Sequence, residues 1–254
     1  MSDLTAFSLA GKRILVTGAN TGIGQGIAVS IARAGGAVIG VGRSSMEETA
    51  SKVAALGGQF ETVAADLADM GAAGPMLDRV WDENGPLDGL VNNAGIIRRA
   101  DAVDLSEADW DDVIDVNLKA VFLLCQAFAR RVLAGGRRGK IVNIASVLSF
   151  QGGIRVASYT ASKHGVLGIT RLLACEWAAK GINVNGIAPG YIETNNTQAL
   201  RADPDRSAAI LGRIPAGRWG EPGDIGDAAV FLLAPASNYM HGAVVPVDGG
   251  WLAR

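Results

Sequence analysis

The chain has 254 residues, of which 49% are hydrophobic and 19% are charged, and its formal net charge is −2. An α/β chain of this length can bury a large core as one unit, so we predict a single domain over residues 1–254. The slight negative charge and the lack of a Lys/Arg block disfavour a nucleic-acid partner, so we expect a small-molecule ligand.

The sequence carries no pattern typical of export, membrane insertion or metal binding. Residues 1–5 are polar and no run of 18 apolar residues occurs, so we expect a cytoplasmic protein without a membrane span. Cys125 and Cys175 form no closely spaced pair. His164 and His241 lie far apart with no metal-ligand spacing around them, and we predict no metal site.

A glycine-rich turn follows the first predicted strand, residues 12–16. A helical pattern begins near Ile27 and stops at residues 35–36. The glycines can bend the chain tightly and let backbone amides approach a pyrophosphate. Their spacing, Gly-x-x-x-Gly-x-Gly, differs from the common Gly-x-Gly-x-x-Gly, but the context of strand and helix fits a dinucleotide site. The residues that we expect at the dinucleotide are Gly18, Asn20, Thr21, Gly22, Ile23 and Gly24.

The ends of the next two strands, residues 37–42 and 60–67, should select the adenosine half of a dinucleotide. The second strand ends at Gly42-Arg43 with no acid. An arginine fork suits a 2′-phosphate, which favours NADP(H) modestly over NAD(H), although Arg43 could equally be a solvated residue opening the next helix. Asp66, before Leu67, could reach the adenine or cap a helix.

A fourth strand, residues 89–91, runs into the polar turn Asn92–Gly95. Residues 105–134 then predict one long helix with a cluster of acids near its start, which we interpret as a solvated face. Asn117 lies inside this helix. An interior helical asparagine usually faces solvent, so the pattern alone assigns it no role.

Three residues near the middle of the chain have the chemistry of a proton-transfer site. Ser146 closes the apolar strand 141–145 and should emerge at the carboxyl end of the sheet. Tyr159 and Lys163 lie one helical turn apart on a helix that should run to about residue 180. A lysine ammonium beside a phenol favours phenolate and should lower the pKa of Tyr159, making it a candidate general acid/base. The trio alone is weak, since Tyr-x-x-x-Lys is common in helices.

The remainder continues the alternation of strands and helices. Residues 182–188 predict a strand, residues 195–215 a polar lid, residues 218–233 a helix and residues 242–250 a last strand and turn. Such alternation is typical of a parallel, doubly wound α/β sheet of the Rossmann type.

Six motifs in this order resemble those of the short-chain dehydrogenase/reductase family over nearly the whole chain. They are Thr17-Gly-x-x-x-Gly-Ile-Gly24, Asn92-Asn-Ala-Gly95, Asn117, Ser146, Tyr159-x-x-x-Lys163 and Pro189-Gly-x-x-x-Thr194. The resemblance implies an NAD(P)-dependent oxidoreductase that interconverts an alcohol and a ketone.

The resemblance also implies roles for individual residues. Tyr159 would give or take the alcohol proton, Ser146 would hold the substrate oxygen, and Lys163 would bind the nicotinamide ribose. Asn117 would support a water relay. Further cofactor contacts are implied for Asn93, Ala94, Gly95, Pro189, Gly190, Ile192 and Thr194.

Segments around the expected pocket resemble the subgroup of that family that acts on deoxy sugar acids from uronate breakdown, many of whose members use NAD(H). A carboxylate needs a cationic partner, and Arg155 with Gln151 offers a fork plus an amide close to Tyr159, while Arg98 could approach from the other wall. Arg155 could instead pair with a surface acid. The substrate residues that we predict are Arg98, Ser146, Gln151, Arg155, Tyr159 and Asn196.

Other functions stay open at this point. Within the family they are a reductase of the alginate-derived 4-deoxy-5-hexoseulose uronate, a gluconate 5-dehydrogenase and a 3-oxoacyl thioester reductase. A redox sensor without catalysis would be expected to lose Tyr159 or Lys163. A serine hydrolase would need a Gly-x-Ser-x-Gly elbow around Ser146, which is missing. Helices 105–134 and 157–180 carry more apolar residues than a sheet needs, and the chain ends in the apolar pair Trp251-Leu252. We therefore predict a homotetramer with these helices and the carboxyl end at interfaces, as the family resemblance also implies.

Overall fold

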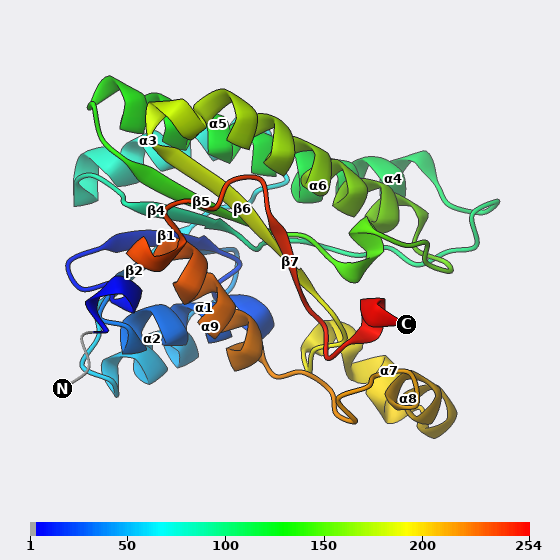
Figure 1. Cartoon of the computed structure of the whole chain (residues 1–254). Coiled ribbons are helices and arrows are strands. Elements are labelled where there is room, and N and C mark those ends of the chain that lie inside the picture. The colour runs from blue at the N-terminus through cyan, green and yellow to red at the C-terminus, as the bar shows by residue number, and fades with distance from the viewer. Residues whose placement is uncertain (1–3) are drawn as a thin grey trace.

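The computed structural model describes residues 4–254, which build one parallel sheet between two layers of helices (Figure 1). The strand order is β3-β2-β1-β4-β5-β6-β7. The strands are β1 (Arg13–Thr17), β2 (Ala37–Gly42), β3 (Phe60–Ala64), β4 (Gly89–Asn92), β5 (Gly139–Ile144), β6 (Ile182–Pro189) and β7 (Val244–Val247). The predicted doubly wound α/β fold is confirmed.

Helices alternate with the strands along the chain. The α-helices of the described part are α1 (Gly22–Arg33), α2 (Glu47–Ala54), α3 (Ala73–Asn84), α4 (Glu107–Ile114), α5 (Ala120–Ala134), α6 (Ala157–Trp177), α7 (Gln198–Ala202), α8 (Pro204–Leu211) and α9 (Pro222–Leu233). None of the helices in residues 4–254 is long and apolar enough to cross a membrane. No cluster of three or more potential metal ligands occurs in the same residues.

Each face of the sheet has its own apolar core. Helices α1, α2 and α9 cover one face, where Ile27, Ile31 and Leu232 are buried. Helices α3, α5 and α6 cover the other (Figure 1), where Leu124 and Phe128 are buried. Burial of each such side chain contributes about 1.5–3 kcal/mol. The strands are therefore fixed from both sides, and their carboxyl ends are free to carry a site.

The predicted helix 105–134 is divided in the structure. It begins at Glu107, where the Ser106 hydroxyl caps the helix by accepting from the Asp109 amide. A π-helical turn, Asp115–Lys119, then separates α4 from α5 and contains Asn117. Likewise, the helix predicted to reach residue 180 ends at Trp177 and continues as a short 3₁₀ turn.

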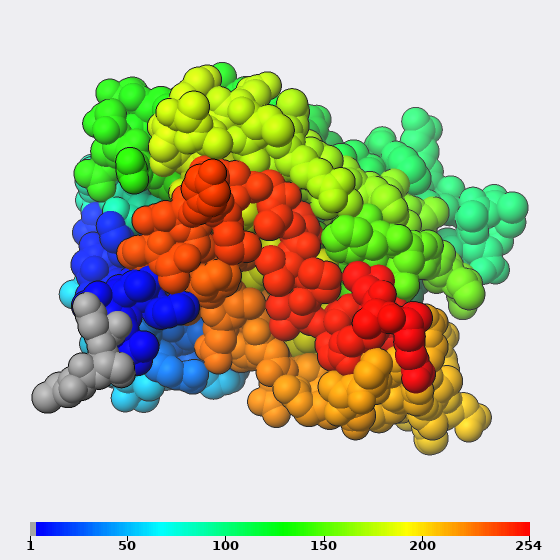
Figure 2. All heavy atoms as spheres, viewed as in Figure 1, coloured from blue at the N-terminus to red at the C-terminus, as the bar shows by residue number. Residues whose placement is uncertain are grey.

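Two segments near the carboxyl end also differ from expectation. Helix α9 begins at Pro222 and not at Arg218, because Glu221 and Asp224 form a capping box around the proline. The predicted lid, residues 195–215, contains the short helices α7 and α8, the second capped by Asp203. In Figure 2 the gold and orange atoms of this lid lie against the red atoms of residues 248–254.

Candidate active site

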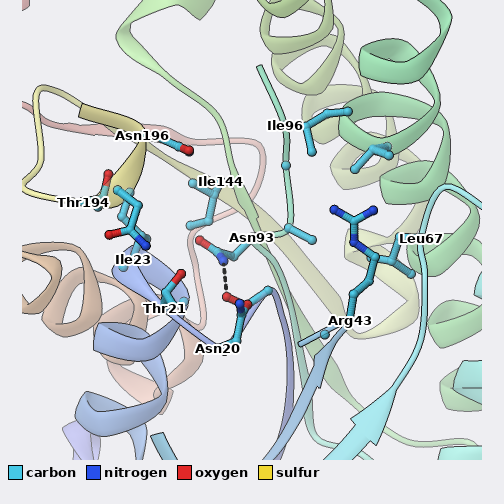
Figure 3. Close-up of a pocket in the computed structure, with 18 of the residues that line it drawn as sticks. Asn20, Thr21, Ile23, Arg43, Leu67, Asn93, Ile96, Ile144, Thr194 and Asn196 are labelled. Atoms are coloured by element: carbon cyan, nitrogen blue, oxygen red, sulfur yellow. Dashed lines mark hydrogen bonds between the residues drawn. The ribbon is translucent and has the colours of Figure 1, made fainter. Parts of the chain in front are cut away.

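A cleft of about 640 Å³ opens at the carboxyl ends of the strands, where the strand order reverses between β1 and β4. Figure 3 places Arg43 and Leu67 at one end of this cleft, Thr194 and Asn196 at the other, and Asn93 between them. Every cofactor residue predicted from the sequence lines it. Of the predicted catalytic and substrate residues, Arg98, Ser146, Tyr159, Lys163 and Asn196 line it, whereas Asn117, Gln151 and Arg155 are absent from its lining.

The glycine turn leaves its backbone accessible to a ligand, because its glycines carry no side chains. Gly18 and Gly22 have left-handed backbones, with φ of 66° and 56°. A Cβ at Gly24 would overlap the Gly18 carbonyl oxygen. The Asn93 amide donates to the carbonyls of Thr17 and Gly18, at 2.9 and 3.2 Å, so it ties the turn to the end of β4. The turn therefore fits a dinucleotide pyrophosphate.

The end of the cleft expected to bind the adenosine carries one exposed ion pair. The Arg43 guanidinium lies 3.5 Å from the Asp66 carboxylate. Strand β3 ends at Ala64, three residues earlier than predicted, and the Asp66 carboxylate accepts from the Ala68 amide. Asp66 thus both lines the cleft and caps a turn. Since an exposed ion pair contributes little to stability, a phosphate could replace Asp66 as the partner of Arg43.

Ser146, Tyr159 and Lys163 come together at the centre of the cleft. Ser146 follows β5, and its hydroxyl accepts from the Leu148 amide at 3.1 Å. Tyr159 and Lys163 stand on α6, with the Lys163 ammonium 5.5 Å from the Tyr159 ring centre. Lys163 is buried and donates to the Ile144 carbonyl at 2.7 Å. The site thus joins a hydroxyl, a phenol and an ammonium.

The electrostatics correct one expectation. Burial raises the pKa of Tyr159 above its ordinary value, opposed by the hydrogen bond with Ser146 and by the charge of Arg99. The predicted lowering by Lys163 is therefore wrong for this state of the protein. Burial also lowers the pKa of Lys163 to about 8. At neutral pH the phenol is protonated and can donate, while the ammonium keeps its charge.

Asn117 has a structural task that the helix pattern did not indicate. Its side chain is fully buried in the π turn. The carbonyl oxygen accepts from the Ile96 amide at 2.8 Å, and the amide donates to the Ile96 carbonyl at 2.9 Å. Asn117 therefore fixes the loop after β4, and Ile96 lines the cleft. The expectation of a solvent-facing asparagine is wrong because the π turn rotates it inward.

The arginines predicted for a carboxylate are already paired. Arg155 precedes α6, has a left-handed φ of 63°, and pairs with Asp101 at 3.3 Å. It lies in the loop before α6, which begins at Ala157, and both side chains of its ion pair with Asp101 are exposed. Gln151 shares this loop. Arg98 does line the cleft, but it forms ion pairs with Asp109 and Asp112 at 3.2 and 2.9 Å.

Arg99 was missed by the sequence analysis. It is exposed, and its charge acts on Tyr159. Its guanidinium donates to the Asn196 carbonyl of the lid at 3.3 Å. The pair Arg98-Arg99 was visible in the sequence, but spacing in a loop does not show that Arg98 lines the cleft while Arg99 reaches the lid.

These features define a short-chain dehydrogenase/reductase, and the chain belongs to that family. Residues 18–252 match the family described as Enoyl-(Acyl carrier protein) reductase. The protein is accordingly an NAD(P)-dependent oxidoreductase that acts on alcohol groups. No histidine lines the cleft within residues 4–254.

Relatives of known name place the chain more closely. It is 57% identical over 251 residues to 2-dehydro-3-deoxy-D-gluconate 5-dehydrogenase of Escherichia coli (strain K12), covering 99% of both chains. A crystal structure from Agrobacterium tumefaciens with bound NADP, described as a 2-deoxy-D-gluconate 3-dehydrogenase, shares 63% identity at a TM-score of 0.94 and covers 98% of this chain and 99% of that one. A gluconate 5-dehydrogenase structure from Beutenbergia cavernae, with NADP at low occupancy, shares 52% identity at a TM-score of 0.94, covering 98% and 100%.

Proposed function

We propose that the protein is a 2-dehydro-3-deoxy-D-gluconate 5-dehydrogenase, also called 2-deoxy-D-gluconate 3-dehydrogenase, which interconverts a ketone and a secondary alcohol on a deoxy sugar acid. The observation that carries this proposal is the 57% identity to the Escherichia coli enzyme along the full length of both chains. A gluconate 5-dehydrogenase is the second candidate, favoured by the 52% identical Beutenbergia cavernae structure.

The geometry supports a mechanism in which a bound nicotinamide would supply the hydride, while side chains of this chain donate or accept the proton. In the reductive direction Tyr159 donates its phenolic proton to the ketone oxygen, for which its raised pKa keeps it ready. The Ser146 hydroxyl orients that oxygen. The Lys163 ammonium would hold the nicotinamide ribose and would stabilise the phenolate that forms. Asn117 keeps the loop at Ile96 in place and supports a water relay.

Arg99 is the side chain that we propose to recognise the carboxylate of a sugar acid, although Arg98 and not Arg99 belongs to the cleft lining. It acts electrostatically on Tyr159 and reaches the lid at Asn196, so a molecule held at Tyr159 under the lid meets its charge. Arg98 and Arg155 are each paired with aspartates. A protein of net charge −2 cannot attract an acid by its overall field, so recognition must be local.

The experiment that tests this proposal compares Arg99→Ala with its two paired neighbours. A charge-assisted pair contributes about 1.5–3 kcal/mol, so Arg99→Ala should raise KM for the keto acid about tenfold or more. The matching keto sugar without a carboxylate should be affected little. Arg98→Ala and Arg155→Ala are matched controls and should change KM less than about threefold. An equal loss with acid and neutral substrate would remove Arg99 from carboxylate recognition.

The proposed cofactor is NADP(H), because the end of β2 presents Arg43 and no acid, and two of the related structures hold NADP. Arg43→Asp should reverse the preference by removing the fork and adding repulsion against the 2′-phosphate. Initial rates with NADPH and NADH measure this directly. Equal kcat/KM for both cofactors in the wild type, unchanged by Arg43→Asp, would show that Arg43 only faces water.

We further propose a cytoplasmic homotetramer. Leu172 on α6 and Trp110 on α4 are large apolar side chains that are 50% and 40% exposed, which supports burial of these helices against other copies. Light scattering at micromolar protein should give the mass of four chains. A mass of one chain would refute the assembly without touching the catalytic proposal.

A further inference from the structure

A group of contacts outside the cofactor cleft joins residues 248–254 to the catalytic serine turn and to the lid. The indole of Trp251 is 4% exposed and packs with Val147 and Ile214. Val147 directly follows Ser146, and Ile214 lies in the lid, which we define as residues 195–215. Trp251 does not line the cofactor cleft. One buried side chain outside the cleft therefore touches both the turn that holds a catalytic hydroxyl and the segment that covers it.

The lid side of this contact is polar as well as apolar. The Arg213 guanidinium carbon lies 3.9 Å above the Trp251 ring, which is cation–π geometry. The Arg254 guanidinium donates to the Gly212 carbonyl at 2.6 Å, and the Ala216 amide donates to the Gly249 carbonyl at 3.0 Å. Figures 1 and 2 show the same arrangement, with residues 248–254 lying against α8. This segment thus binds the carboxyl end of the lid at two places and the residue directly after the lid at a third.

The backbone that presents Trp251 requires glycine. Gly249 and Gly250 are left-handed, with φ of 63° and 88°. A Cβ at Gly249 would lie 2.8 Å from Ile214, and one at Gly250 would lie 3.0 Å from Pro215. The Asp248 carboxylate accepts from the Gly250 and Leu252 amides at 2.8 and 2.9 Å, which fixes the turn from within. The segment is therefore shaped for close approach to the lid.

The cleft side of the contact runs through Tyr191. Its ring centre lies 4.7 Å from that of Trp251 and 5.6 Å from that of Trp219. Tyr191 directly precedes Ile192, which lines the cleft where the nicotinamide is proposed to bind. The Tyr191 carbonyl also accepts from the Gly220 amide at 2.9 Å. A shift of Trp251 would consequently displace the neighbours of both Ser146 and Ile192.

We propose that Trp251 is a positioning residue that holds the lid in register with the Ser146 turn, so that the lid closes over a substrate only when the catalytic hydroxyl is in place. It acts through Val147, Tyr191 and Arg213 and touches no reacting atom. The inference rests on the proposed function only in requiring oxidoreductase turnover at Ser146 and Tyr159, whichever keto acid is used.

Kinetics of Trp251→Ala and Trp251→Phe test the proposal, with Trp81→Ala as the control. Trp81 packs edge-on against Phe128 in the core on the α3 side of the sheet. Trp251→Ala should raise KM for the keto acid about tenfold and lower kcat about threefold, with the Kd of NADPH within about twofold. Trp251→Phe keeps an aromatic ring on Tyr191 and should restore most of the loss. Trp81→Ala should lower Tm with both constants unchanged.

Arg213→Met supplies a second route that leaves the indole in place. It should raise KM by itself, and combined with Trp251→Ala it should add less than about twofold, since both remove one contact. If Trp251→Ala lowers only Tm, Trp251 merely stabilises the fold and the proposal is overturned. If the two increases in KM multiply in full, Trp251 and Arg213 act independently, which also overturns the proposal.

Hydrogen exchange separates this proposal from the substrate assignment, because it needs no turnover. In Trp251→Ala the amides of residues 205–215 should exchange faster than in the wild type, while those of α9 should not. Failure of the wild type to reduce any keto acid would contradict the proposed function but would not affect the exchange result. Unchanged exchange in residues 205–215 would overturn the coupling of lid and serine turn.

Discussion

Tyr159 is the residue that we propose for the proton-transfer step, and its role can be isolated because one oxygen distinguishes it from phenylalanine. Tyr159→Phe should lower kcat about a hundredfold or more, since general acid/base catalysis contributes at least that much. The Kd of NADPH, measured by the fluorescence of the reduced nicotinamide, should stay within about threefold, because the glycine turn is untouched. Retention of more than about a tenth of wild-type kcat would contradict the assignment.

At the level of single residues, sequence reasoning worked where a motif fixes both spacing and secondary structure. Tyr159 and Lys163 share a helix face, and Ser146 ends a buried strand, so all three could be placed in one cleft before the fold was known. Loop residues could not be placed. Arg99 and Arg155 have the same chemistry. Arg155 is distinguished by its ion pair with Asp101 and its left-handed backbone, and Arg99 by its hydrogen bond to the Asn196 carbonyl.

The glycine turn is the element on which cofactor binding depends. Gly24→Ala would push a methyl group into the Gly18 carbonyl and to 2.5 Å from the Asn93 amide. We expect the Kd of NADPH to rise at least about tenfold and the protein to lose about 1–3 kcal/mol of stability through overpacking.

The control for this substitution is Gly223→Ala, in the first turn of α9, where a Cβ would meet nothing within 4 Å. It should leave NADPH binding unchanged and should stabilise the fold by up to about 1 kcal/mol, because alanine loses less backbone entropy on folding. Fluorescence titration and urea denaturation measure the two quantities. Equal effects of both substitutions on NADPH binding would show that the cofactor does not approach the backbone closely at Gly24.

Elements could be predicted in type and order, but less well in extent. The alternation of apolar runs and helical patterns identified the parallel sheet, since buried strands read as continuous hydrophobic stretches. The π turn at Asp115–Lys119 is invisible to that pattern, because the run stays helical in composition on both sides. Helices α7 and α8 were also missed, since five and eight residues are too few for a periodic signal.

The stability of the whole molecule should depend on pH through Lys140. It is partly buried at the start of β5 and donates to Ser237, and burial lowers its pKa to about 8. A lysine in the unfolded chain has a pKa of about 10.4, so between these values the unfolded state binds more protons. The cost of the buried charge is fully present below pH 8 and disappears as pH rises toward 10.4.

Lys140→Met should remove this cost. Allowing for partial solvent screening, the gain in unfolding free energy over the wild type should be about 1–2 kcal/mol larger at pH 7 than at pH 10. Lys180→Met, at an exposed lysine, serves as the control and should show no such difference. Urea denaturation at both pH values measures the unfolding free energies of the wild type and the two variants. A gain that does not change with pH would mean that Lys140 keeps its ordinary titration in the folded state.

The reaction itself is tested most directly by initial rates of the wild type, each measured with NADPH and with NADH. The substrates are the 5-ketone that corresponds to 2-dehydro-3-deoxy-gluconate, 5-keto-gluconate, the alginate-derived uronate, a 3-oxoacyl thioester and a neutral keto sugar. The highest kcat/KM should belong to the 3-deoxy keto acid with NADPH, and the neutral sugar should be poorer by about tenfold or more because Arg99 then has no carboxylate to bind. Equal rates with acid and neutral ketones, or a clear preference for the thioester, would contradict a sugar-acid dehydrogenase.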